Sequence, residues 1–296
     1  MTKKWLIIIL PLFFANLAKC QDSITIHQGT IAPLYFDKPN FLRSLSYVPN
    51  DMLYIAKSPF QKKNWIILSG IAASTYLIQL KDQNILNWVK EKSSQAGLDP
   101  TTKYHDALKF GKTRIIKIPQ NTNSTLYQLG EGGTSMLIAG GLWLYGKIKH
   151  DNIAVQTCFD LSETFVTMGV TTQILKRISG RESPFKSTVS GGRWSPLPSF
   201  TSYQQHTPTY DAFPSGHLAT MVATVTVLTK NYPEKKWIKP LGYSLIGLTG
   251  WAMVNTEVHW LSDYPLAIAV GYLSGKVATM RHLKPICMNQ YNTTAF

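Results

Sequence analysis

The stretch Pro214-Ser215-Gly216-His217 stands directly before an apolar run at 217–229. Apolar side chains recur in this run at three- and four-residue spacing, at Leu218, Met221, Val222, Val225 and Leu228. This spacing predicts a helix with one continuous apolar face. The helix would begin at the Ser-Gly pair, so its first backbone N–H groups would point at an anion bound there.

Five other segments of helical length have apolar residues at the same spacing. They are 65–80, 134–148, 159–176, 241–256 and 264–280. Strand-like alternation is scarce, and its best candidate runs from Arg114 to Ile118. The pattern therefore predicts an all-α protein in which six helices pack as a bundle.

Whether these helices cross a membrane is left open by their composition. Each segment is interrupted by Thr, Ser, Gln, Gly or a charged residue, and none is an uninterrupted apolar stretch of about 18 residues. This favours a soluble or surface-attached bundle and leaves an integral inner-membrane form as the alternative.

Polar segments flank and separate the expected helices. Residues 21–63 contain spaced prolines and are predicted to form an irregular N-terminal extension, and 286–296 form a C-terminal tail around a helical domain at 64–285. Two long polar connections lie inside that domain, at 81–123 and 182–213. The second is rich in Ser, Pro, Gly and Thr, and a connection of this length beside a candidate site is typical of a lid or specificity loop.

Residues 1–20 have the pattern of a secretory signal peptide. Two lysines precede an apolar run, and Ala18-Lys19-Cys20 places small residues where a cleavage site needs them. Cleavage after Cys20 would export the protein to the cell envelope, as a periplasmic or membrane-associated protein. An uncleaved anchor is the alternative, and a lipoprotein acylated on Cys20 fits poorly with the preceding lysine.

The chain carries a formal net charge of +14 over 296 residues. A basic surface of this size suits phosphorylated substrates or acidic lipid headgroups, although a protein that is merely basic is as well supported. No Lys/Arg-rich run interleaved with aromatic residues favours nucleic-acid binding. The expected partners are therefore a phosphate ester and a membrane surface, and the oligomeric state stays open.

Cysteine and histidine usage predicts no metal site. Behind the leader, Cys158 and Cys287 have no zinc-ligand spacing, and they form either one disulfide or two buried free thiols. Several histidines lack a partner at ligand spacing and are expected at the surface: His105, His150, His206 and His282. No cofactor is implied.

Two histidines and a carboxylate are the candidate catalytic residues. His259 is followed four residues later by Asp263, and positions four apart share one face of a helix. The carboxylate would then fix the imidazole tautomer and make His259 a nucleophile or base. His217 follows the Ser-Gly pair, and Lys176 and Arg181 supply positive charge upstream. These parts suggest phosphate chemistry carried by histidine.

Each of these residues also has a purely structural interpretation. Taken alone, His259 would be a buried core histidine, and His217 would be a helix-start residue behind the N-cap Ser215. Arg177 is best explained as a charge that complements a helix dipole. For Arg181, a role as a phosphate ligand and a place at the surface are equally well supported.

Three segments, taken together and in their order along the chain, favour the functional interpretation over the structural one. They are Lys176-Arg-Ile-Ser-Gly-Arg-Glu-Ser-Pro184, the tetrapeptide ending at His217, and His259-Trp-Leu-Ser-Asp263. Their order and separation resemble the signature motifs of the type 2 phosphatidic acid phosphatase / vanadium haloperoxidase superfamily, K-x6-R-P, P-S-G-H and S-R-x5-H-x3-D. The resemblance implies a six-helix bundle of the acid phosphatase / vanadium haloperoxidase type over roughly 65–280.

The resemblance also implies a role for each matching residue. His259 would attack phosphorus and become a phosphohistidine, Asp263 would orient it, and His217 would protonate the leaving oxygen. The phosphoryl oxygens would be held by the lysine of the first motif and by Ser215 and Gly216 of the second. Splitting hydrolysis through a covalent intermediate divides one hard step into two easier ones.

Two positions depart from the superfamily pattern. The arginine of the first motif is replaced by Ser183 and that of the third by Met253. Charge-assisted hydrogen bonds contribute about 1.5–3 kcal/mol each, so two uncompensated losses would slow catalysis strongly. Arg181 and Arg193 are the candidates for compensation.

The sequence therefore predicts a metal-independent phosphomonoesterase that acts on lipid phosphates or related envelope phosphate esters. One alternative is a vanadate-dependent haloperoxidase, which the two missing arginines disfavour. Another is a degenerate, non-enzymatic envelope member of the superfamily. Transfer of phosphate to an acceptor other than water stays open, because it begins with the same phosphohistidine.

Overall fold

The computed structural model describes residues 25–27, 34–36, 38–110, 113–281 and 284–285. The expected leader, Cys20, Cys287, His282 and the C-terminal tail lie outside these residues. Cys158 is buried, and its pairing with Cys287 stays open.

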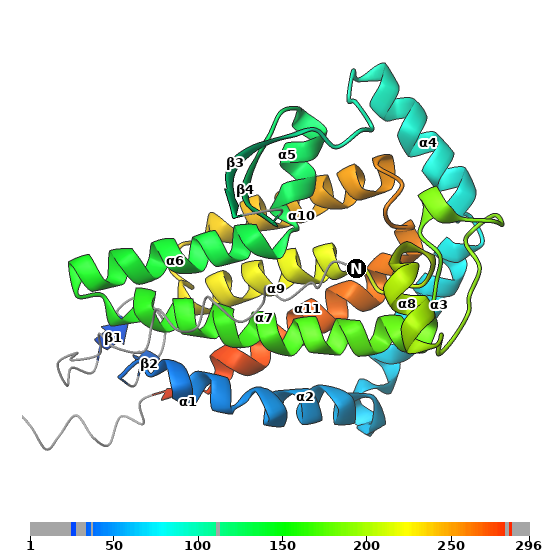
Figure 1. The fold of residues 1–296 in the computed structure, drawn as a ribbon. Coiled ribbons are helices and arrows are strands. Elements are labelled where there is room, and N and C mark those ends of the chain that lie inside the picture. The colour runs from blue at the N-terminus through cyan, green and yellow to red at the C-terminus, as the bar shows by residue number, and fades with distance from the viewer. Residues whose placement is uncertain (1–24, 28–33, 37, 111–112, 282–283, 286–296) are drawn as a thin grey trace, which may run out of the picture.

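The described chain is mostly helical, which confirms the all-α prediction (Figure 1). Its α-helices are α1 (Phe41–Ser46), α2 (Val48–Lys57), α3 (Trp65–Gln79), α4 (Asp82–Gln95), α5 (Thr122–Leu129), α6 (Gly132–Lys149), α7 (Asn152–Ser179), α8 (Phe200–Gln205), α9 (Gly216–Asn231), α10 (Ile238–Asn255) and α11 (Tyr264–Met280). The six expected helices correspond to α3, α6, α7, α9, α10 and α11.

The other helices differ from the prediction. Residues 41–57 were expected to be irregular and instead form α1 and α2. The polar connection at 81–123 contains α4, whose buried positions Asp82, Leu86, Val89 and Ser93 are three and four residues apart. Half of this stripe is polar, so hydropathy alone does not reveal it.

Short strands complete the fold. β3 (Tyr104–Phe110) and β4 (Thr113–Pro119) form an antiparallel hairpin, and β4 contains the expected strand at 114–118. A second sheet has the order β1–β2–β5, with β1 (Thr25–His27), β2 (Leu34–Phe36) and β5 (Lys284–Pro285). Short 3₁₀ turns connect other elements, and one of them, η6 (Leu261–Asp263), carries a candidate catalytic residue.

Helix α9 lies at the centre of the bundle, in contact with α6, α7, α10 and α11 (Figure 1). Its predicted apolar stripe is inside, with Leu218 2% exposed and Val222 7% exposed. The rest of the helix is also covered, since every residue from 218 to 227 is buried. The core therefore surrounds α9 on all sides.

The threonines of α9 can be buried because their hydroxyls form hydrogen bonds within the helix. The hydroxyls of Thr220, Thr224 and Thr226 each donate to the backbone carbonyl four residues earlier, at 2.7–2.9 Å. A buried hydroxyl that is satisfied within its own helix needs no water. The polar interruptions in this segment are thus compatible with a core helix.

The outer helices expose many apolar side chains. No residue of α3 is buried, and Ile66 is 87% exposed. Helix α7 carries a line of half-exposed side chains, Val166, Val170, Ile174 and Ile178. Among the described helices, none combines the length and the apolar composition required of a membrane span.

Close packing of α11 on α9 depends on glycine. A Cβ on Gly275 would lie 2.9 Å from the carbonyl oxygen of Ala223, and one on Gly271 would press against that of Ala219. We predict that Gly275→Ala lowers the free energy of unfolding by about 1–3 kcal/mol, because the clash is with backbone. Gly247→Ala is the control, since nothing lies within 4 Å of a Cβ on Gly247, an exposed helical position in α10.

Chemical denaturation measures both variants. The control is expected to be neutral or stabilising by up to about 1 kcal/mol, since alanine favours helix over glycine. Equal stability of the two variants would show that α9 and α11 are not packed this closely.

Candidate active site

The site lies where the C-terminal end of α7 meets the N-terminal end of α9. Lys176 is in the last turn of α7 and is only 6% exposed. Its Nζ is 3.5 Å from Oδ2 of Asp211. A Cβ built on Gly216 would lie 3.7 Å from the same Nζ, so the ammonium group sits beside the first residue of α9. Positive charge and a helix N-terminus therefore converge, as an anion site requires.

Ser215 is the N-cap of α9. Its fully buried hydroxyl accepts a hydrogen bond from the N–H of Leu218 at 3.3 Å and lies 3.7 Å from Sδ of Met253. Its backbone N–H donates to the carbonyl of Asp263 at 3.1 Å. Ser215 thus fixes the helix start against η6, and its hydroxyl already has a capping role in addition to the expected contact with phosphate.

The two histidines are brought together across the sequence. The rings of His217 and His259 have centroids 5.8 Å apart and planes at 67°. His217 is partly buried and packs on Tyr127, with centroids 4.7 Å apart. His259 is 2% exposed. The two imidazoles are therefore direct neighbours, although 42 residues separate them in the sequence.

The carboxylate of Asp263 lies next to Nδ1 of the His259 imidazole. Nδ1 of His259 is 3.4 Å from Oδ2 of Asp263, longer than a normal hydrogen bond. The expected shared helix face is wrong: His259 lies in the loop after α10, and Asp263 ends η6. The turn is held instead by Asp263 itself, whose Oδ2 accepts from the N–H of Trp260 at 2.8 Å.

Burial controls protonation at this site. Burial, with the positive charge of Lys176 next in importance, lowers the pKa of His259 to about 3. Burial, with His259 next in importance, lowers the pKa of His217 well below its usual value. Burial raises the pKa of Asp263 to about 6, although Arg181 acts in the opposite direction. At neutral pH both imidazoles are uncharged and Asp263 is ionised.

Comparison with known proteins finds a related family over part of the chain. Residues 158–285 match the model of the PAP2 superfamily. This segment, a little under half of the chain, is therefore similar to the PAP2 superfamily. The match covers all the candidate catalytic residues and supports phosphatase-type activity in general.

One solved structure is also similar, the crystal structure of the first transmembrane PAP2 type phosphatidylglycerolphosphate phosphatase from Bacillus subtilis. It is 14% identical, with 86% of this chain and 98% of that chain covered and a TM-score of 0.36. No curated protein matches the chain.

Arg181 does not occupy the position expected of a PAP2 phosphate ligand. It is fully buried, and Nη1 donates to Asp263 and Ser262, each at 2.6 Å. Nη2 donates to Asp82 at 2.7 Å and to the carbonyl of Gly191 at 2.6 Å. Four donor contacts are thus committed to the protein, which corrects both earlier interpretations: Arg181 is neither a surface residue nor a free ligand.

The structure also shows what surrounds the two positions where the motif arginines are replaced. Arg193 is exposed and pairs with Glu182 through its backbone, so its expected compensating role has no support in the structure. Ser183 is 2% exposed, and Met253 is fully buried in the core around α9. Met253 therefore fills its position with an apolar side chain against Ser215. Lys176 remains the cation with the largest effect on the His259 imidazole.

Sequence reasoning missed three residues of the site: Asp82, Asp211 and Tyr127. Asp211 pairs with Lys176, and Tyr127 covers one side of His217. Asp82 reaches the site from α4, about a hundred residues before Arg181. None lies within the three motifs, and no local spacing connects them to the site.

The connection at 182–213, predicted to be a lid or specificity loop, contacts Arg181 beside the site. Its backbone forms isolated bridges from Trp194 and Asp211 to Arg181. The carboxylate of Glu182 accepts from the N–H groups of Thr188 and Arg193 and holds the loop in place. Among the described residues, no group of three or more His, Cys, Asp or Glu is placed to hold one metal ion.

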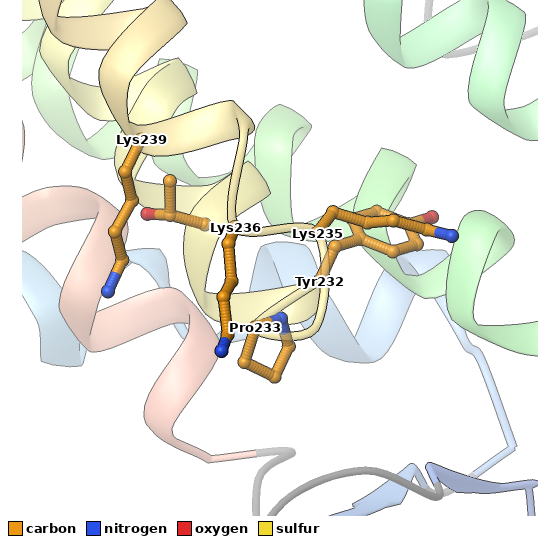
Figure 2. A pocket seen from close by; sticks show the side chains of 6 residues that line it. Tyr232, Pro233, Lys235, Lys236 and Lys239 are labelled. Carbon is orange, nitrogen blue, oxygen red and sulfur yellow. The ribbon is translucent and has the colours of Figure 1, made fainter.

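A cavity of about 340 Å³ lies away from these residues. It is lined by the last turn of α9, the turn that follows it and the start of α10: Thr229, Tyr232, Pro233, Lys235, Lys236 and Lys239. Lys236 and Lys239 point to one side of the turn, and Lys235 points to the other beside Tyr232 (Figure 2). Since His217 is at the opposite end of α9, this cavity is separate from the candidate site.

We predict that the imidazole of His259 stays neutral down to about pH 4, because burial and Lys176 oppose its charge. Histidine NMR titration measures this, with the signal assigned by its loss in His259→Gln. Lys176→Met should raise the pKa of His259, since one source of repulsion is removed while burial persists. A midpoint near 6.5 in the unmodified protein would contradict this picture of the site.

Proposed function

We propose that the protein is a metal-independent phosphomonoesterase that works through a phosphohistidine on His259. The observation that carries this proposal is the meeting of the two imidazoles, 5.8 Å apart, beside Lys176 and the start of α9. The match of residues 158–285 to the PAP2 superfamily supports the reaction class, and the geometry supports the assignment of each role.

The first step is attack on phosphorus by Nε2 of His259, because Nδ1 faces Asp263. An N–P bond forms as the P–O bond to the leaving alcohol breaks. His217 gives its proton to that oxygen. His217 is neutral before substrate binds, and the negative charge of the phosphate raises the pKa of a nearby imidazole so that it can take up this proton.

In the second step water attacks the phosphohistidine. His217, now neutral, accepts a proton from the water, a new P–O bond forms, and the N–P bond breaks to restore His259. Inorganic phosphate leaves with its charge balanced by Lys176. The carboxylate of Asp263 stabilises the positive charge that develops on the His259 ring in both steps.

Phosphoryl oxygens need fixed donors that match the charge of the transition state. The ammonium of Lys176 and the N-terminal N–H groups of α9 supply them. With serine and methionine at the two arginine positions, this set is smaller than the superfamily motifs provide. We therefore expect a working enzyme whose turnover depends strongly on Lys176.

Lipid phosphates or related envelope phosphate esters are the proposed substrates. Helix α3 has no buried residue, and it contacts η6, which carries Asp263. Its exposed side chains include Trp65, Ile67 and Leu77, each at least 59% exposed. An apolar face next to a phosphate site suits an amphiphilic substrate and a membrane surface. The expected leader at 1–20 supports export to the cell envelope.

We predict that the purified protein releases inorganic phosphate from phosphatidate in vesicles, without added metal and in the presence of a chelator. His259→Ala should lower turnover by at least about 1,000-fold, since it removes the nucleophile. His105→Ala is the matched control, because His105 is exposed on β3 and should leave turnover unchanged.

A soluble aryl phosphate, assayed in parallel, tests the substrate class. We expect the lipid to be turned over with higher kcat/KM. Full activity in His259→Ala would overturn the mechanism. No phosphate release from either ester would favour the degenerate alternative, and bromination with added vanadate and peroxide would favour the haloperoxidase.

A further inference from the structure

Arg181 joins the carboxylate behind the candidate nucleophile to a second buried carboxylate. Its Nη1 is 2.6 Å from Oδ1 of Asp263, and its Nη2 is 2.7 Å from Oδ2 of Asp82. All three side chains are 0% exposed. A planar guanidinium holds two carboxylates in a fixed relative orientation, which a single ammonium cannot do.

Asp82 is the far end of this connection. It is the first residue of α4 and lies outside the segment that matches the PAP2 model. Its Oδ1 accepts from the N–H of Ser262 at 3.1 Å, and its Oδ2 accepts from the Ser262 hydroxyl. Asp82 therefore fixes both Arg181 and the residue next to Asp263.

The plane of the guanidinium is fixed as well. Its central carbon is 4.8 Å from the ring centre of Trp194 and 5.5 Å from that of Trp260. Trp260 in turn donates its indole N–H to the carbonyl of Glu182 at 2.9 Å. Aromatic rings and hydrogen bonds together leave Arg181 one orientation.

This orientation determines how Asp263 meets His259. Oδ1 of Asp263 is held by Arg181, so Oδ2 is left for the N–H of Trp260 and for Nδ1 of His259. We propose that Asp82 is a positioning residue that sets the angle of the His259 imidazole through Arg181 and Asp263. The proposal rests on the proposed role of His259 as nucleophile.

An ordinary structural ion pair is the competing explanation, and the chain contains one for comparison. Asp51 on α2 is 1% exposed and pairs with Arg281, Oδ2 lying 3.1 Å from Nη2. Arg281 follows the last residue of α11, a helix about 25 Å long that begins directly after Asp263. The Asp51 carboxylate is thus buried like Asp82, whereas its partner Arg281 is 26% exposed and also pairs with Glu163. This group lies far from the histidines.

The test compares Asp82→Asn with Asp51→Asn in the full chain. Both variants remove one buried charge and keep side-chain volume, so both should lower the unfolding midpoint. We expect Asp82→Asn to lower kcat for phosphatidate by on the order of 10- to 100-fold with little change in KM, because a nucleophile out of position reacts slowly. Asp51→Asn should keep the unmodified kcat.

Ser262→Ala is the milder variant should Asp82→Asn fail to fold. It removes the hydroxyl between Asp82 and Arg181 but keeps the backbone contact with Asp82, and we expect a several-fold loss in kcat. Arg181→Lys tests whether Asp82 acts through Arg181. A double variant that combines it with Ser262→Ala or with Asp82→Asn should lose no more kcat than the worse single variant, because both changes break the same connection.

The outcomes separate this proposal from the proposed function. If His259→Ala removes activity while folded Asp82→Asn and Ser262→Ala keep the unmodified kcat, the positioning role is wrong and the mechanism stands. An equal loss of kcat in Asp51→Asn, or additive losses with Arg181→Lys, would also overturn it. If His259→Ala keeps full activity, the proposed function fails and this role fails with it.

Discussion

A guanidinium removed from water between two carboxylates is the interaction on which the rest of the site depends. Losing the hydration of these three charges is costly, and the cost is offset only if every partner is in place. Arg181 meets this requirement with Asp82, Asp263, Ser262 and the carbonyl of Gly191. Segments from α4, the end of α7, the long connection and η6 are thereby fixed to one another.

The histidines take their positions from this fixed group. His259 follows the turn after α10 and is placed by Asp263, and Asp263 also accepts the N–H of Ser215 on its carbonyl. That last bond fixes the start of α9, and with it His217 and the helix N-terminus beside Lys176. The proposed nucleophile, acid and phosphate donors therefore share one support, so a change at Arg181 would affect all of them.

Sequence periodicity predicted much of the fold for identifiable reasons. The stripe that includes Leu218 and Val222 marked α9 correctly, and burial of its threonines followed from bonds within the helix. Helix α4 was missed because two of its four buried positions, Asp82 and Ser93, are polar. Their burial depends on partners distant in sequence, such as Arg181 and Trp251, which local patterns do not show.

The candidate site was predicted in part for a similar reason. The motifs located His217, His259, Asp263 and Lys176, which the structure brings together. They did not show that Arg181 faces inward, since its two aspartates are in different segments. The four-residue spacing of His259 and Asp263 led to the right proximity through the wrong local structure, a loop and a short 3₁₀ turn instead of a helix.

Trapping of the covalent intermediate tests the central claim most directly. The protein would be mixed with excess phosphatidate, quenched within milliseconds at alkaline pH, digested and analysed by mass spectrometry. We predict the mass of one phosphoryl group on the peptide that contains His259, acid-labile and absent from His259→Ala. Turnover with phosphate on another residue, or with no phosphorylated peptide at any quench time, would contradict the account.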